Sequence, residues 1–339
     1  MTHAPDKDQD LLIALQRGVP IVRRPLAAIA ESVGATEADV VRFARDLFEK
    51  RIARRFGAVF DSRRLGYGST LCAVDVPEPE LERVAALLHP HPGVTHCYER
   101  QGRPNLWFTL TAPAGELESE LRCMEAGMTP YRIHNLPALQ RFKVEVVLDA
   151  TPFDTEAAPG ASPKATRDDA APQLTEREKD VVRLLQGNLP LSEEPFTAAA
   201  QKLGWDSTEL LNLLASWKQL GILRRVAIIL RHRAAGFTAN GMCVWHVPRA
   251  QVEVAGRKLA TCPEVTHCYE RPPVSAEFPY NLFAMVHARE RPAAEAIFRR
   301  LTEFAGLADG RMLMSTREFK KSSPVFFLED CGTHGEGKA

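Results

Sequence analysis

The spacing of hydrophobic residues changes along the chain in an order that occurs twice. Between residues 8 and 51, apolar side chains recur every three or four positions, which predicts three amphipathic helices, with Thr36 as the cap of the third. After Arg54 the spacing switches to alternation, with two helical stretches among the alternating ones. This pattern predicts strands near 55–60, 69–76, 93–100, 105–111 and 142–148, and helices at 80–88 and 115–126.

The second half of the chain repeats this succession. Helical spacing runs from 174 to 223, and Gly204 occupies the turn that corresponds to Gly34 in the first half. Both turns have the spacing of a helix-turn-helix. The strands and helices that follow are expected at 225–230, 241–247, 252–260, 265–271, 281–287, 293–304 and 319–327.

Individual residues repeat as well as patterns. The seven residues Val-Thr-His-Cys-Tyr-Glu-Arg occur at 94–100 and again at 265–271. Arg54-Arg55 matches Arg224-Arg225, and Phe142-Lys143 matches Phe319-Lys320. We therefore interpret the chain as a fused pseudo-dimer, whose halves are joined by a flexible tether rich in Ala, Pro, Thr and Asp.

The order of elements indicates the fold class. In each half a helix-turn-helix comes first, and from the second strand onward the order is strand, helix, strand, strand, helix, strand, which is typical of a ferredoxin-like unit. We predict an α+β protein of two tandem repeats, each a winged helix-turn-helix followed by a ferredoxin-like sandwich. The expected domains are the first helix-turn-helix at 1–53, the first ferredoxin-like domain at 54–149, a linker at 150–173, the second helix-turn-helix at 174–223, the second ferredoxin-like domain at 224–330 and a disordered tail at 331–339.

Composition narrows the class of protein. The 339 residues are 45% hydrophobic, and 43 basic residues balance 43 acidic ones, which disfavours a protein built to grip nucleic acid. The polar N-terminus has no features of a signal peptide, and no apolar stretch approaches the ~18 residues of a membrane span. The seven cysteines form no C-x-x-C pair. We therefore expect a cytoplasmic protein with reduced thiols, away from membranes and without a metal site of its own.

The predicted architecture resembles the leucine-responsive/AsnC family of transcription regulators. The recognition helices argue against that function, because Glu37 and Asp39 open the first and Asp206 and Glu209 open the second. Acidic side chains suit a helix N-terminus but are poor contacts for phosphates. We expect no DNA binding, and a regulator that senses a small ligand remains the alternative.

More specific motifs lie in the later part of each half. They include Arg-Arg-Phe-Gly from Arg54, Asn-Leu-Trp-Phe from Asn105, Asn-Gly-Met-Cys-Val-Trp from Asn240 and Thr-Arg-Glu-Phe-Lys-Lys from Thr316. These motifs resemble the two subunit types of the sirohaem decarboxylases, over nearly the whole chain outside the linker. The resemblance implies decarboxylation of the C12 and C18 acetates of sirohaem to 12,18-didecarboxysirohaem, towards haem d1 or haem. It implies sirohaem, an iron tetrapyrrole, as the partner, and no cofactor beyond the iron of that substrate.

Such a substrate carries carboxylates around an apolar ring, so its site needs several cations over a hydrophobic floor. Aromatic candidates for the floor are Trp107, Phe237 and Trp245, although strand aromatics are commonly plain core. Tyr98 and Tyr269 are candidates to hold a histidine or a carboxylate. The candidate clamps, each of which has the alternative of a solvated surface residue, are Arg54, Arg55, Arg63, Arg64, Arg100, Arg224, Arg225, Arg231, Arg233 and Arg271.

Losing carbon dioxide from an acetate leaves carbanion character on a methylene carbon, which then needs a proton. A histidine suits that delivery, and the repeated His96 and His267 are the candidates, although a strand histidine is commonly a satisfied core residue. His232 is a third, and its counterpart in the first half is Ser62. We therefore expect one of two pseudo-symmetric sites to be competent. An axial iron ligand and a haem carrier without catalysis remain open, as does further homo-oligomerisation.

Overall fold

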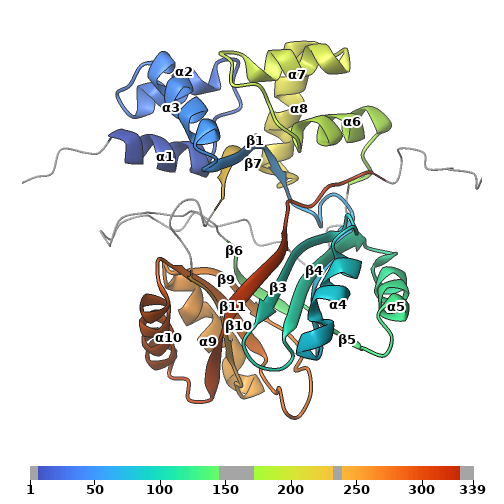
Figure 1. Cartoon of the computed structure of the whole chain (residues 1–339). Helices are drawn as coiled ribbons and strands as arrows, with labels where there is room; N and C mark the ends of the chain where they lie inside the picture. The colour runs from blue at the N-terminus through green and yellow to red at the C-terminus, as the bar shows by residue number, and fades with distance from the viewer. Residues whose placement is uncertain (1–6, 145–171, 232–238, 329–339) are drawn as a thin grey trace, which may run out of the picture. The chain divides into compact units, whose positions relative to one another are not determined.

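The computed structural model describes residues 7–144, 172–231 and 239–328. They fall into two compact units, and each unit takes segments from both repeats (Figure 1). The first unit contains Met1–Gly66, Val147–Ala235 and Val325–Ala339, and the second contains Tyr67–Val146 and Gly236–Pro324. Linker residues 150–171, the expected tail at 331–339, and the candidates His232, Arg233 and Phe237 lie outside the described residues.

The first unit holds the helices of both helix-turn-helix motifs. Thr36 accepts a hydrogen bond from the Asp39 amide while Asp39 bonds back, so the predicted cap is confirmed as a capping box. Thr175 and Glu178 form the same box in the second repeat. The helices are α1 (Lys7–Arg17), α2 (Pro25–Ser32), α3 (Glu37–Glu49), α6 (Glu176–Leu185), α7 (Pro195–Leu203) and α8 (Ser207–Gln219).

A two-stranded sheet completes the first unit. Strand β1 (Ala53–Phe60) pairs antiparallel with β7 (Leu223–Leu230), so each repeat contributes one strand to a shared ribbon. Phe56 and Val226 are buried in it beneath the helices. The ribbon therefore belongs with the helices. The ferredoxin-like sheet begins at Tyr67 in the first repeat and at Ala239 in the second, whereas the sequence predicted that these domains start at residues 54 and 224.

The second unit is built on one nine-stranded sheet of the described residues, in the order β5-β2-β4-β3-β11-β8-β10-β9-β6. Helices α4 (Leu81–Leu88), α5 (Leu117–Gly127), α9 (Arg249–Thr261) and α10 (Arg291–Ala305) accompany it, with a short 3-10 turn η1 (Glu78–Glu80) (Figure 1). The strands are β2 (Tyr67–Val74), β3 (Val94–Arg100), β4 (Leu106–Pro113), β5 (Ile133–Pro137), β6 (Gln140–Val144), β8 (Ala239–Trp245), β9 (Val265–Glu270), β10 (Leu282–Ala288) and β11 (Gly310–Lys321).

Each repeat has the ferredoxin-like strand order, fourth-first-third-second, as β5-β2-β4-β3 and as β11-β8-β10-β9. The last strand of each repeat then crosses to the other. Gly310–Met314 of β11 pairs with β8 of its own repeat, and the rest of β11 pairs with β3 of the first repeat. In return, β6 leaves the first repeat and pairs with β9. The predicted strand near 319–327 is therefore wrong in its bounds, because the strand begins at Gly310 and ends at Lys321.

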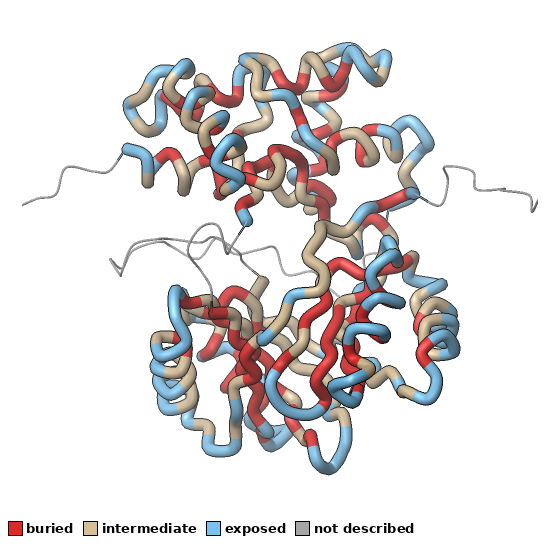
Figure 2. The backbone as a smooth tube through the Cα atoms, in the orientation of Figure 1, coloured by how far each residue is buried: buried red, intermediate tan, exposed pale blue. Residues whose placement is uncertain are grey.

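Among the described residues, the three larger hydrophobic cores of the second unit lie on the two faces of its sheet. One lies between the sheet and α4 and α5, and a second lies between the sheet and α9 and α10. Figure 2 shows buried strands beneath helices whose outer faces are exposed. The third core forms on the opposite face of the sheet and takes side chains from both repeats, namely Ala73, Trp107, Leu136, Met242, Val244, Phe278, Tyr280, Phe283 and Leu313. We call this the inner face.

Candidate active site

The repeated heptapeptide places three of its side chains on the inner face. Along β3, Cys97 packs into the helix-side core, so alternation directs His96, Tyr98 and Arg100 to the other side. The register agrees, because Tyr98 lies opposite Trp107, a residue of the inner-face core. In β9 the same argument applies, since Cys268 lies in the helix-side core and Tyr269 lies opposite Phe283. We call His96, Tyr98 and Arg100 the first ladder, and His267, Tyr269 and Arg271 the second ladder.

Within each ladder the three side chains contact one another in sequence. The rings of His96 and Tyr98 have centroids 6.2 Å apart, and those of His267 and Tyr269 are stacked at 6.1 Å. The guanidinium carbon of Arg100 lies 5.4 Å from the Tyr98 ring centroid, and that of Arg271 lies 4.6 Å from the Tyr269 centroid. Each tyrosine ring is therefore held between an imidazole and a guanidinium, a cation–π arrangement that fixes both neighbours.

A threonine orients each histidine. Nδ1 of His96 lies 3.0 Å from Oγ1 of Thr95, and Nδ1 of His267 lies 3.1 Å from Oγ1 of Thr266. Both threonines are buried, whereas both imidazoles are partly exposed. The histidines are thus fixed at the edge of the inner face rather than enclosed in its core.

The arginines of the ladders reach into the opposite repeat, and Arg100 is buried whereas Arg271 is half-buried with its Nε enclosed. Nη1 of Arg100 donates to the Leu313 carbonyl at 3.0 Å, and Nη1 of Arg271 donates to the Leu136 carbonyl. In both, the Nε–H is buried and has no hydrogen-bond partner among the described residues. Burial lowers the pKa of each guanidinium to about 10. Two cations with spare donors therefore lie in a face of low polarity, where an anion would be bound strongly.

The exchanged strands make the two ladders chemically different. In β11, Lys321 lies opposite His96 and Glu318 lies opposite Tyr98. In β6 the equivalent positions are Val144, opposite His267, and Arg141, opposite Tyr269. The first ladder thus has an acid and a base beside it, whereas the second has one cation and an apolar side chain.

Only part of the predicted aromatic floor lies beside the ladders. Trp107 is buried on the inner face, where its indole N–H donates to the Pro104 carbonyl at 2.8 Å and its ring packs on Phe278. Trp245 is on the helix side of the sheet, stacked on Phe298 and bonded to the Thr302 hydroxyl at 3.0 Å. The prediction for Trp245 is therefore wrong, because the alternation of β8 turns this residue away from the face that holds the second ladder.

The remaining candidate arginines lie in the first unit. Arg55 donates to the Gln186 carbonyl just after α6 and to the Ala58 carbonyl at 3.0 Å, and burial lowers its pKa to about 10. Arg224 is paired with Asp61 at 2.6 Å. These two side chains support the ribbon and its helices within the first unit. Arg54, Arg63, Arg64, Arg225 and Arg231 also lie on β1, β7 or directly after them.

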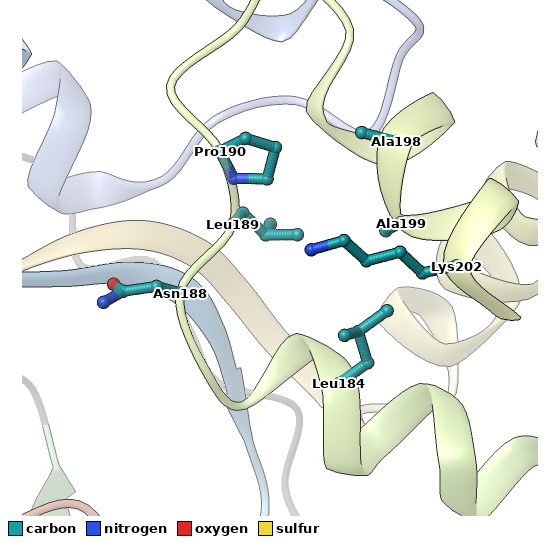
Figure 3. Close-up of a pocket in the computed structure, with 7 residues that line it drawn as sticks. All are labelled: Leu184, Asn188, Leu189, Pro190, Ala198, Ala199 and Lys202. Atoms are coloured by element: carbon teal, nitrogen blue, oxygen red, sulfur yellow. The ribbon is translucent and has the colours of Figure 1, made fainter.

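Neither a metal centre nor a membrane span occurs among the described residues. No group of three histidine, cysteine or acidic side chains among them has metal-binding geometry. None of their helices is long and apolar enough to cross a membrane. Figure 3 shows a pocket in the first unit, with Lys202 pointing into it between α6 and α7. Its volume of about 10 Å³ accommodates roughly one water molecule, so it does not accept a macrocycle.

Sequence reasoning missed the residues that the exchanged strands bring to the ladders. Arg141, Glu318 and Lys321 were not predicted as site residues, and neither were Lys143 and Lys320 on the helix side of the same strands. Nζ of Lys143 donates to the Cys262 carbonyl at 2.8 Å, and Nζ of Lys320 donates to the His89 and His91 carbonyls at 2.6 and 2.7 Å. The repeated Phe-Lys pair was a signal for these lysines, but it did not reveal that each would contact the opposite repeat.

Comparison with known proteins gives consistent results over most of the chain. The model of an AsnC-like ligand binding domain matches residues 64–143 and 234–320, and that of a siroheme decarboxylase NirDL-like HTH domain matches 8–54 and 178–224. A siroheme decarboxylase of Hydrogenobacter thermophilus is 37% identical, with 94% of this chain and 95% of that protein covered. Crystal structures of the siroheme decarboxylase NirDL, alone and in complex with an iron-uroporphyrin III analogue, match at 34% identity with TM-scores of 0.71 and 0.70, covering 96% of both chains.

Proposed function

The chain belongs to the siroheme decarboxylase family, whose members are carboxy-lyases, and we propose that it converts the acetate side chains at C12 and C18 of sirohaem to methyl groups. The products are then 12,18-didecarboxysirohaem and two molecules of carbon dioxide. The observation that carries this proposal is the pair of His-Tyr-Arg ladders on the inner face. Each joins a proton donor to a buried cation with an unused donor group, and both are needed by a reaction on a carboxylate.

The ladder supplies the binding step through its arginine. The Nε–H of Arg100 and of Arg271 is enclosed, so a substrate acetate that displaced its apolar cover would gain a charge-assisted hydrogen bond there. The cost of burying each guanidinium, which its lowered pKa records, is then offset by an opposite charge. Trp107 and its inner-face neighbours are buried and form the apolar support on which the ladders rest.

The histidine supplies the proton. Breaking the bond between the methylene and the carboxylate leaves an electron pair on the methylene carbon, and this pair is delocalised into the conjugated ring of the substrate. The imidazolium of His96 or His267 then protonates that carbon to give a methyl group, carbon dioxide departs, and water returns a proton to the imidazole. The threonine at Nδ1 holds the ring in one orientation during this transfer. Tyr98 or Tyr269 keeps imidazole and guanidinium at a fixed separation.

The second ladder is the better match for a polyanionic substrate. Arg141 lies beside Tyr269 at the position where the first ladder has Glu318, which repels carboxylates. His232, which lies outside the described residues, belongs to the same repeat as the second ladder and has Ser62 as its counterpart. We therefore propose that decarboxylation takes place at the second ladder and that the first ladder contributes less to the rate.

The direct experiment is anaerobic incubation of the purified chain with sirohaem, followed by mass spectrometry of the tetrapyrrole. The expected products are lighter by one and then by two carbon dioxide units. His267→Ala should lower the rate by about 10²–10⁴-fold, the range for loss of a general acid, and His96→Ala should lower it less. His246→Ala is the control, because this histidine is exposed and pairs with Asp309.

Two results would contradict the proposal. Unchanged sirohaem with the wild-type chain, under conditions in which it binds, would make the protein a carrier. Equal and full activity of both histidine variants would remove the ladders from the chemistry. An altered absorption spectrum of bound sirohaem in a variant that retains full activity would instead assign that histidine as an axial iron ligand.

A further inference from the structure

Contacts between the two repeats are of two kinds. Some would form between any two repeats, and others form only when a first repeat pairs with a second repeat. Arg100 and Arg271 each donate to a leucine carbonyl of the opposite repeat. Lys143 and Lys320 each donate to a carbonyl that follows a helix of the opposite repeat. Because both members of each pair are identical, these contacts would form equally well between two first repeats or two second repeats. They favour pairing without selecting the partner.

A cluster of charges in the first unit does select the partner repeat. Nε of Arg23 lies 3.0 Å from a carboxylate oxygen of Glu194, and Nη2 of Arg24 lies 3.0 Å from one of Glu193. In the offset of 170 residues that relates the repeats here, Arg23 corresponds to Glu193 and Arg24 to Glu194 (23 + 170 = 193; 24 + 170 = 194). The two ion pairs are therefore the two symmetry copies of one contact. Two first repeats would bring four arginines together at this point, and two second repeats would bring four glutamates together.

A second cluster, in the other unit, disfavours pairing of two first repeats. Arg317 of β11 contacts Glu99 at 2.6 Å, Glu82 at 2.7 Å and Glu78 at 3.0 Å, all in the first repeat. The residue that corresponds to Arg317 is Gln140, which lies opposite Glu270 on β9. If two first repeats paired, Gln140 would replace Arg317 and leave the three carboxylates without their cation.

A third contact disfavours pairing of two second repeats. Asp61 of the first repeat is paired with Arg224 of the second at 2.6 Å. The residue that corresponds to Asp61 is Arg231, so two second repeats would place Arg231 against Arg224 twice. This contact taken alone would suit two first repeats, because Arg54 corresponds to Arg224. The other two clusters exclude that pairing.

We propose that these charges form a pairing code, which makes each repeat associate preferentially with a repeat of the other kind. The partner that the first repeat fits is a second repeat, of the same chain or of another copy of it. The specificity arises from repulsion in the wrong pairs, whereas the shared lysine and arginine contacts supply affinity to any pair. As a consequence every assembled sheet contains one ladder of each kind, whichever chains contribute the halves.

A double-mutant cycle at Arg23 and Glu194 tests the contact in the full chain. Arg23→Glu and Glu194→Arg should each lower the thermal midpoint, and the double variant R23E/E194R should recover much of the loss, because opposite charges face each other again. The coupling should correspond to roughly a threefold change in the folded-to-unfolded ratio, typical of an exposed pair, and should shrink in 0.5 M salt. The cycle cancels the hydrogen bond that Glu194 makes with Thr197. Strictly additive losses would overturn the proposal.

A mixing experiment tests the selection of partners. The variant R23E/R24E carries glutamates on both sides of the contact, and E193R/E194R carries arginines on both sides. Each alone should remain at its own mass of 37.6 kDa. Unfolded together and refolded at low salt, they should form some species of twice that mass, because across this contact each half then finds an opposite charge only in the other variant. Mixtures that give the same masses as the separate variants would refute the code.

Discussion

Arg100 and Arg271 are the residues whose placement is hardest to explain by stability alone. No ion pair involves either one in the part of the chain that the structure describes, and Arg100 is only 6% exposed. Burial of a cation without an acidic partner costs free energy, and both side chains also leave a buried Nε–H unsatisfied. A bound carboxylate would remove both costs at once.

Replacement of Arg271 by methionine separates a role in stability from a role in binding the substrate. The variant loses a hydrogen bond to the Leu136 carbonyl but no longer buries a charge, so we expect the free energy of unfolding to stay within about 1–2 kcal/mol of wild type. Affinity for sirohaem should fall by roughly 10- to 100-fold, from the loss of about 1.5–3 kcal/mol. Urea unfolding and spectroscopic titration measure the two quantities, with Arg100→Met as the matched control at the first ladder. A large loss of stability with unchanged affinity would show that Arg271 stabilises the fold and does not bind the substrate.

The same arginine gives a sign for the pH dependence of stability. Its pKa in the folded chain, about 10, is below its usual value, so above that pH the folded state has released a proton that the unfolded state still holds. The contribution of this group to stability therefore rises with pH above about 10. The contribution is lowest below that pH, where the folded chain holds the guanidinium in its charged form. The difference in urea midpoint between wild type and Arg271→Met should grow in favour of wild type from about pH 9.5 to about pH 11. A constant difference would place the guanidinium in a more polar environment.

How far the sequence predicts individual residues depends on what their neighbours are. The exact repeat of the heptapeptide predicted that His96 and His267 share one environment, and each does lie between a threonine and a tyrosine on its strand. Trp245 was misassigned, since an aromatic residue on a strand faces one side or the other and the motif does not reveal which. The contacts of Arg55 could not be predicted for a related reason. Its partner, the Gln186 carbonyl, is 131 residues away in sequence, and no local pattern predicts that contact.

At the scale of elements, the exchanged strand β6 is held by a space that a glycine leaves in α9. An ideal Cβ built on Gly256 would lie 2.4–2.5 Å from ring atoms of Phe142, which packs against the core of the second repeat. The corresponding residue of the first repeat is Ala85, beneath Phe319. The two exchanged strands are thus not interchangeable, because the glycine in the second repeat leaves more space for the phenylalanine of the incoming strand than Ala85 leaves in the first.

Gly256→Ala should therefore loosen β6 from β9. Overpacking of this size costs about 1–3 kcal/mol, and the strand that it displaces also carries Arg141 beside the second ladder. We expect a lower thermal midpoint and faster hydrogen exchange at Arg141–Val144. Gly127→Ala is the control, because a Cβ on that glycine, the last residue of α5, meets nothing within 4 Å and should not lower the thermal midpoint. Equal effects of the two substitutions would mean that Phe142 moves aside at little cost.

The elements themselves were largely predictable, and their pairing was not. Hydrophobic spacing and caps such as Thr36 define the helices, because those signals are local. The exchange of β6 and β11 depends on which edge strand is nearest when the repeats meet, and this is a property of two folded sheets. The early start of β11 at Gly310 follows from the same cause, since Gly310–Met314 pairs with β8 of its own repeat before the strand crosses to the first repeat.

At the scale of the whole molecule, the helix-turn-helix motifs raise the question of DNA. The acids at the start of the recognition helices are engaged within the protein, since Glu37 pairs with Arg24 and Asp39 bonds Thr36 and Arg42. Asp206 caps α8 through the Thr208 and Glu209 amides, which lower the pKa of its carboxyl. The balance of 43 basic and 43 acidic residues leaves no general attraction to a polyanion.

We therefore expect no salt-sensitive binding of duplex DNA, including DNA from upstream of its own gene. Fluorescence anisotropy at about 50 mM salt is the measurement, because phosphate contacts are strongest at low ionic strength and weaken steeply as salt rises. The variant E37K/E209K is the comparator. It replaces two acids near the starts of α3 and α8 with lysines while leaving the caps Thr36 and Asp206 in place, so it should acquire weak binding that 200 mM salt abolishes. Wild-type binding with a steep salt dependence would show that the helix-turn-helix units keep a function in transcription beside the ladders.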